Sequence, residues 1–272
     1  MLRTREKLFC YGVAALFIAF LLAPILWMLS SSLKGPLDIF AKPPVLVGDV
    51  TLENYRQVLS DSTFMRSFLN SVLVSAGTVV ASMLLALPAA YGLSRLRSVA
   101  KAGLLSWVLL VRAAPGMIFV IPYFVAFTQI GLMDTRIGLI VINTVFTAPL
   151  AIWILIAFFD AIPLEIEEAA VVDGATRWQT FLRVSLPMAA PGIVSAAILV
   201  FIFSWNEFLF ALTLTQVEAK TAAVAILNYM AYQGTEWGKI AAAGIIILLP
   251  VAVFAVAIRK YFIQTAAGGV KG

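Results

Sequence analysis

Long apolar runs dominate the chain, separated by short polar segments. A helix of about 20 apolar residues matches the thickness of a bilayer core, and six such runs can be placed along the sequence. Membrane barrels use shorter, alternating strands, so the length of the runs excludes them. The pattern predicts an all-α integral membrane protein with six transmembrane helices. The expected spans are approximately Phe9–Leu29, Asn70–Leu93, Leu104–Phe127, Ile137–Phe159, Pro191–Thr213 and Ile240–Ile258.

One polar, charged segment stands out between the fourth and fifth expected spans. Pro163 suits a first helical turn, and the glutamates that follow it complement the positive end of a helix dipole. Gly174 can adopt the left-handed conformation that ends a helix. Thr176 and Gln179 match a capping box, so a second helix is expected to run from there until Pro187 stops it. The segment is predicted to form a compact knob of two short helices, with an ordinary amphipathic connector as the alternative.

Composition supports the membrane assignment and narrows the chemistry. The chain is 62% hydrophobic and 12% charged, whereas soluble domains are roughly 45–50% apolar and about 25% charged. Its single cysteine, Cys10, excludes an intrachain disulfide, and the lack of histidine excludes a His or Cys metal site. The acids are scattered, so the catalytic cluster that a membrane-embedded enzyme would need is missing from the sequence. We expect one domain that is not itself an enzyme.

The basic residues predict the orientation. If the spans are numbered as above, eleven of them fall on the side that holds both termini and the knob, against seven on the other side, while Arg112 lies inside a span. The side richer in Lys and Arg is cytoplasmic by the positive-inside rule. Both termini and the knob are therefore predicted to be cytoplasmic. The net charge of +5 is explained by this topology, so it need not indicate nucleic-acid binding.

The knob carries a sequence pattern of known type. Glu168-Ala169-Ala170 is followed by Gly174 and, nine residues later, by Val184, one residue and Leu186-Pro187. This spacing resembles the cytoplasmic loop of ABC importer permeases. Thr51 to Tyr55, Trp205 to Phe208 and the glycine-rich C-terminal end add a specific likeness to the binding-protein-dependent, maltose-type sugar permeases, and the ending is similar to that of the smaller permease of such importers.

The resemblance implies the type I ABC importer permease fold and an arrangement of the chain within it. Residues 1–69 would form the first transmembrane helix and an external loop, and 70–260 the transmembrane core with a coupling loop at about 160–190. Residues 261–272 would form a cytoplasmic tail. The membrane would be a bacterial plasma (inner) membrane, crossed several times.

The resemblance also implies partners. These would be a second, homologous permease, two ATPase subunits and an extracytoplasmic sugar-binding protein. The sequence contains no G-x-x-x-x-G-K-[ST] phosphate loop, so ATP and Mg would be bound by the ATPase and no cofactor by this chain. The residues implied to couple the chain to the ATPase are Glu168, Ala169, Ala170, Asp173, Gly174, Trp178, Leu186 and Pro187.

Polar residues within spans are candidates for the substrate path, because they are costly against lipid. Asn143, Trp205, Asn206 and Glu207 offer amide, carboxylate and aromatic groups that suit sugar hydroxyls, although helix–helix hydrogen bonding is an equal alternative. Arg112 is a weaker candidate, since snorkelling or a fixed ion pair would also explain it. The last external loop offers contacts to the binding protein, with an interfacial aromatic belt as the alternative. These contacts are Asn228, Tyr229 and Gln233.

Together these observations predict a permease subunit of an ATP-driven carbohydrate importer, for a di- or oligosaccharide. An ABC permease for another solute, such as glycerol phosphate, a polyol or a peptide, is the first alternative. Arg112 is the only basic residue within a span, which favours a neutral substrate over a phosphate. A secondary transporter would leave the knob unexplained and would often show inverted repeats. The sequence leaves open which sugar is carried.

Overall fold

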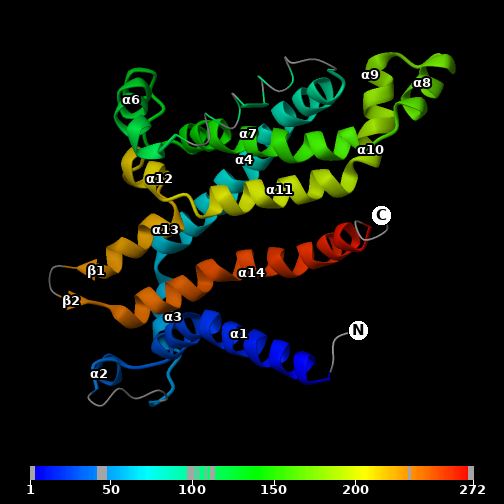
Figure 1. Ribbon diagram of the computed structural model, residues 1–272. Coiled ribbons are helices and arrows are strands. Elements are labelled where there is room, and N and C mark those ends of the chain that lie inside the picture. The colour runs from blue at the N-terminus through cyan, green and yellow to red at the C-terminus, as the bar shows by residue number, and fades with distance from the viewer. Residues whose placement is uncertain are drawn as a thin grey trace. The chain divides into compact units, whose positions relative to one another are not determined.

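The computed structural model describes residues 4–41, 48–96, 114–231 and 234–268 and parts of 101–110. These residues are mostly helical, and their elements are labelled in Figure 1. They form two compact units. Unit 1 comprises Met1–Arg66 and Ala225–Leu249, and unit 2 comprises Ser67–Val224 and Pro250–Gly272.

Unit 1 joins the N-terminal helix to the start of the C-terminal one. Asn54 on α3 donates through Nδ2 to the carbonyl oxygens of Ser32 and Lys34, at 3.0 and 2.8 Å. Backbone carbonyls at the end of α1 and just beyond it thereby gain hydrogen-bond partners. Gly238 permits the close approach of α14, because a Cβ there would lie 2.5 Å from Asn54 Oδ1. The elements of this unit are α1 (Thr4–Ser32), α2 (Pro36–Ile39), α3 (Glu53–Ser60), η2 (Ile226–Tyr229), the antiparallel pair β1 (Met230–Ala231) and β2 (Gly234–Thr235), and the first part of α14 (Trp237–Gly268).

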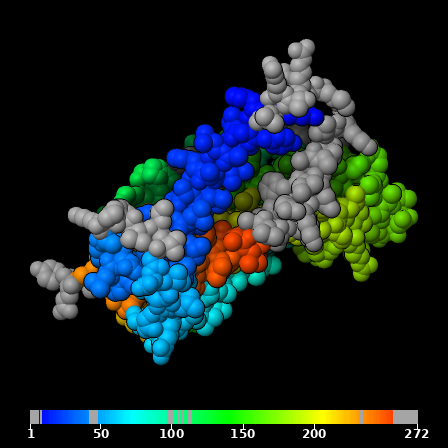
Figure 2. Space-filling model, turned by 90° about the horizontal axis from the view of Figure 1, so that it is seen from below, coloured from blue at the N-terminus to red at the C-terminus, as the bar shows by residue number. Residues whose placement is uncertain are grey.

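Helix α1 keeps its apolar side chains on the surface of the chain. Phe9, Leu16 and Phe20 are 73%, 75% and 75% exposed, and Figure 2 shows exposed atoms of this helix in blue. Exposed apolar surface of this extent on a span-length helix is suited to lipid or to another membrane subunit.

Unit 2 is built around α7 and α11, which Figure 1 shows side by side. Gly192 on α11 lies directly against the ring of Phe158 on α7, so the two backbones approach closely. A buried polar contact also joins α7 to the helix of Ser62–Ser94, where Ser82 Oγ and Thr147 Oγ1 lie 2.8 Å apart. The elements of this unit are α4 (Ser62–Ser94), α6 (Gly116–Gln129), α7 (Arg136–Asp160), α8 (Leu164–Val172), α9 (Arg177–Thr180), η1 (Phe181–Ser185), α10 (Leu186–Met188), α11 (Ala190–Trp205), α12 (Leu209–Leu214) and α13 (Ala222–Ala225), together with the rest of α14.

The structure agrees with the expected spans at four places. Within the described part of the chain, the helices long and apolar enough to cross a membrane are Phe9–Ser32, Ser62–Ser94, Arg136–Asp160 and Trp237–Phe254, and a bent pair, Arg177–Met188 with Ala190–Trp205, supplies a fifth candidate. The expected third span is described as one continuous helix only over Gly116–Gln129, and Arg112 lies outside the described residues. Six spans therefore remain a prediction.

The expected fifth span, Pro191–Thr213, is not one continuous helix. It is divided at Asn206 to Phe208 into α11 and α12. The carboxylate of Glu207 accepts the N–H groups of Phe210 and Ala211 at 2.7 and 3.0 Å. These N–H groups would otherwise lack hydrogen-bond partners at the start of α12. The carboxylate of Glu207 therefore offsets the loss of backbone hydrogen bonds at the break between the two helices.

Candidate coupling site

The polar segment after α7 folds into the predicted knob. Helix α8 follows Pro163 and ends at Val172, Asp173 is its C-cap, and Gly174 has a φ of +92°, in the left-handed region expected for it. The N–H of Ala175 then donates to the carbonyl oxygen of Ala170 at 2.9 Å, which closes the turn. The turn between the two short helices thus depends on a conformation that glycine adopts without strain.

The second helix starts as predicted. Thr176 Oγ1 accepts the N–H of Gln179 at 3.3 Å, and Gln179 Oε1 accepts the N–H of Thr176 at 2.8 Å, which completes a capping box.

The expected end of this helix at Pro187 is confirmed to within one residue. The chain continues from α9 through the π-helical turn η1 and α10 to Met188, and only then bends by 77° into α11. Pro187 lacks an N–H and would crowd the carbonyl of the preceding turn. In η1 the N–H of Leu186 bonds to the carbonyl of Phe181, five residues back. This wider turn accommodates the proline within the helix.

The predicted coupling residues lie mostly on the surface of the knob. Those that are exposed are Glu168, Ala169, Asp173, Gly174, Trp178 and Pro187, while Ala170 and Leu186 are half-buried. Val172 and Trp178 are 86% and 61% exposed. Figure 1 shows α8 and α9 projecting beyond the ends of α7 and α11. An apolar and acidic surface on a projecting polar segment is typical of a protein contact site.

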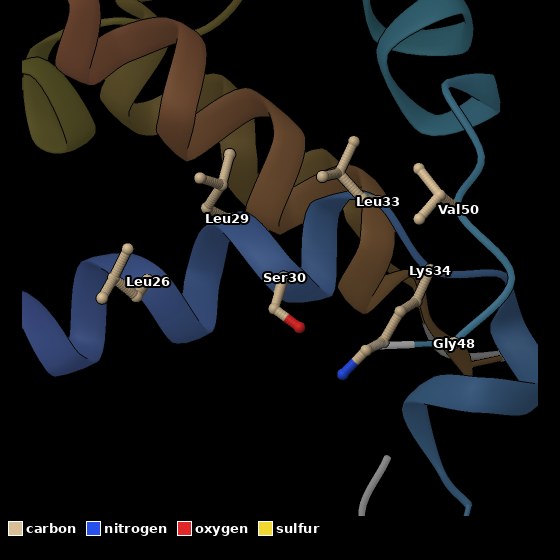
Figure 3. A pocket seen from close by; sticks show the side chains of 7 residues that line it. All are labelled: Leu26, Leu29, Ser30, Leu33, Lys34, Gly48 and Val50. Carbon is tan, nitrogen blue, oxygen red and sulfur yellow. The ribbon is translucent and has the colours of Figure 1, made fainter. Parts of the chain in front are cut away.

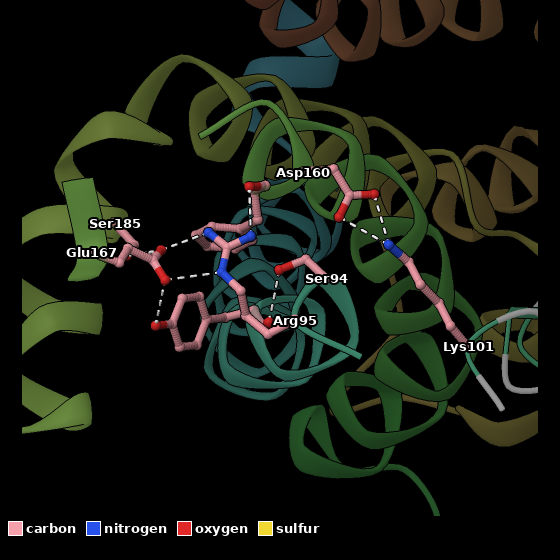
Figure 4. A network of polar contacts seen from close by, with 8 residues as sticks. Ser94, Arg95, Lys101, Asp160, Glu167 and Ser185 are labelled. Carbon is pink, nitrogen blue, oxygen red and sulfur yellow. Dashed lines mark hydrogen bonds and ion pairs between the residues drawn. The ribbon is translucent and has the colours of Figure 1, made fainter. Parts of the chain in front are cut away.

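The residues that hold the knob in place were missed by the sequence reasoning. Glu167, next to the exposed Glu168, is 8% exposed. Its carboxylate accepts from Arg95 Nε at 2.9 Å and Nη2 at 2.5 Å, from Ser185 Oγ at 2.6 Å and from Tyr91 O–H at 3.2 Å (Figure 4). We call Tyr91, Arg95, Glu167 and Ser185 the knob quartet.

The quartet stabilises its own charges. Burial opposes ionisation of Glu167, but the hydrogen bonds from Arg95 and Ser185 and the positive charge of Arg95 outweigh it, so the pKa of the carboxyl is lowered. Burial likewise opposes the charge of Arg95, and the hydrogen bond and charge of Glu167 outweigh it, so the pKa of the guanidinium is raised. The pair is therefore ionised at neutral pH. The distribution of Lys and Arg along the sequence predicts that Arg95 and the knob lie on the same side of the membrane, which is the signal in the sequence for this contact.

Two of the substrate-path candidates lie within the helix packing. Asn143 is buried and donates through Nδ2 to Ser204 Oγ at 3.0 Å, and Ser204 in turn donates to Thr78 Oγ1 at 3.2 Å. Trp205 is also buried and meets the ring of Phe68 on α4 edge-on, with ring centroids 5.6 Å apart. Both side chains have structural contacts on neighbouring helices.

The other two path candidates lie at the break between α11 and α12. Asn206 is exposed and donates through Nδ2 to the carbonyl of Ile202 at 2.8 Å, while Glu207 is half-buried and caps α12. The structure thus separates the four candidates into a buried pair and a pair at the helix break.

The candidates for the binding-protein contact divide as well. Asn228 is exposed, whereas Tyr229 is buried, and its O–H donates to Asp61 Oδ2 at 2.9 Å. Burial, with the hydrogen bond to Asp61, raises the pKa of Tyr229. Gln233 lies outside the described residues. Of the two that the structure describes, Asn228 offers the surface suited to a contact.

A second polar cluster lies at the end of unit 2 away from the knob. Asp134, with a φ of 52°, accepts the N–H groups of four consecutive residues, Gln216 to Ala219, each at 3.0 Å. Asn70 donates to the carbonyls of Glu218 and Lys220 at 2.8 and 3.0 Å and accepts from Arg136 Nε at 2.7 Å. We call Asn70, Asp134, Arg136 and the loop 215–222 the Asp134 latch.

Unit 1 carries a small pocket of about 180 Å³ at the end of α1. Figure 3 shows its lining, which is apolar apart from Ser30 and Lys34. Its lining residues include none of the predicted site residues. They are Leu26, Leu29, Ser30, Leu33, Lys34, Gly48 and Val50.

Comparison with known proteins bears on both the knob and the fold. Residues 79–267, which include the knob quartet, match the family described as "Binding-protein-dependent transport system inner membrane component". The chain is 40% identical over 261 residues to "Trehalose transport system permease protein SugB" of Mycobacterium tuberculosis, covering 94% of this chain and 95% of that protein. It is 32% identical over 272 residues to "Trehalose/maltose transport system permease protein MalG" of Thermococcus litoralis, covering 96% and 95%.

Among solved structures, the fold is similar to a chain of a bacterial ABC transporter involved in the import of the acidic polysaccharide alginate. The TM-score is 0.78 with 23% sequence identity, over 96% of this chain and 99% of that chain. A likeness at this identity bears on the fold, and it matches the fold expected from the sequence.

Proposed function

The chain belongs to the family of binding-protein-dependent transport system inner membrane components, and from this premise we propose that it is a permease subunit of an ATP-driven carbohydrate importer. It would form half of the translocation path in a bacterial inner membrane. The names of its relatives, which refer to trehalose and maltose, support a di- or oligosaccharide as the substrate. The observation that carries the proposal is the exposed apolar and acidic surface of the projecting knob.

The knob is proposed to dock on an ATPase subunit. Trp178 and Val172 offer a large apolar contact, and Glu168 and Asp173 lie beside them with charge to complement a basic partner. The capping box and the Gly174 turn fix the relative direction of the two helices, so this surface is preorganised.

The remaining partners follow from the same proposal. A second, homologous permease would complete the path and contribute to covering the exposed face of α1. Two ATPase subunits would hydrolyse ATP with Mg, and an extracytoplasmic binding protein would deliver the sugar. Both termini are proposed to be cytoplasmic, on the side of the knob, as the distribution of Lys and Arg supports.

Substitution of Trp178 tests the docking proposal. Trp178→Ala removes the most exposed aromatic side chain of the knob, and loss of such an anchor costs about 2 kcal/mol of binding free energy. We expect the immobilised permease pair to retain the ATPase subunit roughly thirtyfold less tightly. The measurement is a titration of retained ATPase subunit against its concentration.

Trp153→Ala provides the matched control. Trp153 is 53% exposed but lies on α7, away from the knob, so its removal is expected to leave ATPase binding unchanged. Equal retention by the unsubstituted chain and Trp178→Ala would contradict docking through this surface.

A further inference from the structure

We propose that Arg95 and Glu167 are positioning residues that pass movement of the knob to the transmembrane helices, with Tyr91 and Ser185 holding the pair in register. This inference rests on the proposed function, because it requires an ATPase that moves the knob. It concerns the buried contacts between the knob and the helix ends, whereas the docking proposal concerns the exposed surface of the knob.

The carboxylate of Glu167 joins three separate elements. Glu167 itself lies on α8, Arg95 directly follows α4, and Ser185 is the last residue of η1, which leads to α11. All of these hydrogen bonds meet on the two oxygens of one side chain (Figure 4). Both helical arms of the knob are therefore tied to the end of a membrane span at one point.

The guanidinium of Arg95 adds a further connection. Nε and Nη2 bind Glu167, while Nη1 donates to the carbonyl of Phe159 at 3.0 Å, near the end of α7. The forked guanidinium–carboxylate contact fixes direction as well as distance. A displacement or rotation of α8 is thus passed to the ends of both α4 and α7.

The surroundings make the link stiff. The side chains of Arg95 and Glu167 are only 19% and 10% exposed, so their attraction is less weakened by water than that of a surface pair. Removing one partner would leave the other charge buried and uncompensated. The ring of Tyr91 packs against both Phe181 and Phe159, with centroids 4.8 and 5.6 Å away. Without the link, the knob could bend at the turn after α7 or at the 77° bend after Met188.

A neighbouring ion pair serves as a control. Lys101 Nζ and Asp160 Oδ2 are 2.9 Å apart at the same end of unit 2, with side chains 24% and 40% exposed. Asp160 is the last residue of α7, and neither partner belongs to the knob. Breaking this pair removes an ion pair of similar type without cutting the proposed link.

The experiment compares the unsubstituted chain, Glu167→Gln and Asp160→Asn in complete transporters reconstituted in liposomes with the binding protein. Radiolabelled disaccharides, beginning with trehalose and maltose, identify a sugar that the unsubstituted chain imports. Retained ATPase subunit, ATP hydrolysis and uptake are then measured on the same preparation. We expect Glu167→Gln to retain the ATPase and hydrolyse ATP, while uptake per ATP falls roughly 2- to 30-fold. Asp160→Asn should keep the ratio of the unsubstituted chain.

Two further variants keep the test decisive. Arg95→Met combined with Glu167→Gln should lower uptake per ATP no further than Glu167→Gln alone, because both changes cut the same link. If Glu167→Gln fails to assemble, Arg95→Lys retains the charge but loses the fork, and it should lower the ratio by a smaller factor.

The outcomes separate this inference from the proposed function. An unchanged ratio in Glu167→Gln, or in Arg95→Lys where Glu167→Gln does not assemble, would overturn the link alone. An unsubstituted chain that retains no ATPase subunit would overturn the proposed function, and the inference with it.

Discussion

The two ends of unit 2 each anchor a projecting segment through one carboxylate, but with different partners. At the knob, Glu167 is held by the side chains of Tyr91, Arg95 and Ser185. In the latch, Asp134 is held by four backbone N–H groups of a single loop. Backbone donors are present whatever the loop sequence, so the latch depends chiefly on Asp134. The knob depends on the identity of residues in several elements, and its support can be changed at any of them.

Asp134→Ala should release the loop of the latch, and we expect it to have the largest effect on local stability of the substitutions considered. Four N–H groups lose a charged acceptor, and alanine tolerates the φ of 52° less well than aspartate. We expect a loss of about 3 kcal/mol of local stability, seen as faster hydrogen exchange of amides 216–219. Val217→Ala, which keeps its N–H, should exchange at the original rate. Equal exchange in Asp134→Ala would mean that the carboxylate does not anchor the loop.

Gly174→Val should affect the knob end by about 1–3 kcal/mol of backbone strain, since a β-branched residue resists a φ of +92°. The surrounding space is open within 4 Å of an added Cβ, so the strain comes from the backbone alone. We expect membrane insertion and binding of the second permease to survive, while substrate-stimulated ATP hydrolysis and uptake fail.

Gly174→Asn is the control for this change, because asparagine tolerates the left-handed conformation and should retain most of the uptake. Normal transport by Gly174→Val at normal protein levels would remove the geometry of the knob from the mechanism.

Ser185→Ala should have the smallest effect, about 1 kcal/mol for one hydrogen bond. It also tests whether the hydrogen bond from Ser185 lowers the pKa of Glu167. The lowered pKa of Glu167 contributes stability that is present above its unfolded-state pKa and lost as the pH falls through the folded-state pKa. Without Ser185 the folded-state pKa moves up toward its ordinary value, so the stability lost on acidification should be smaller and the loss should be complete at a higher pH. Melting temperatures measured across the acidic range test this, and identical profiles would exclude a role for Ser185 in charging Glu167.

Local sequence signals predicted the features that depend on local physics. The Gly174 turn and the capping box of Thr176 and Gln179 follow from backbone and cap chemistry within a few residues. The four confirmed spans follow from the length of their apolar runs.

What the sequence did not reveal depends on tertiary placement. Glu167 and Glu168 are identical side chains side by side, and the tertiary placement of Tyr91, Arg95 and Ser185 around Glu167 distinguishes the buried one. The break after Trp205 was missed because the apolar run continues through Leu209 to Leu212, and the capping role of Glu207 depends on its rotamer. The π turn that precedes Pro187 was not predicted from the sequence.

That π turn has a consequence for helical phase. A π-helical turn takes up one residue more than an α-helical turn, and each residue of an α-helix advances the angular position of the next by about 100°. The extra residue within Phe181–Ser185 therefore sets the azimuth at which α8 and α9 meet the axis of α10. The direction in which the knob faces is encoded by the number of residues in the turn as well as by their chemistry.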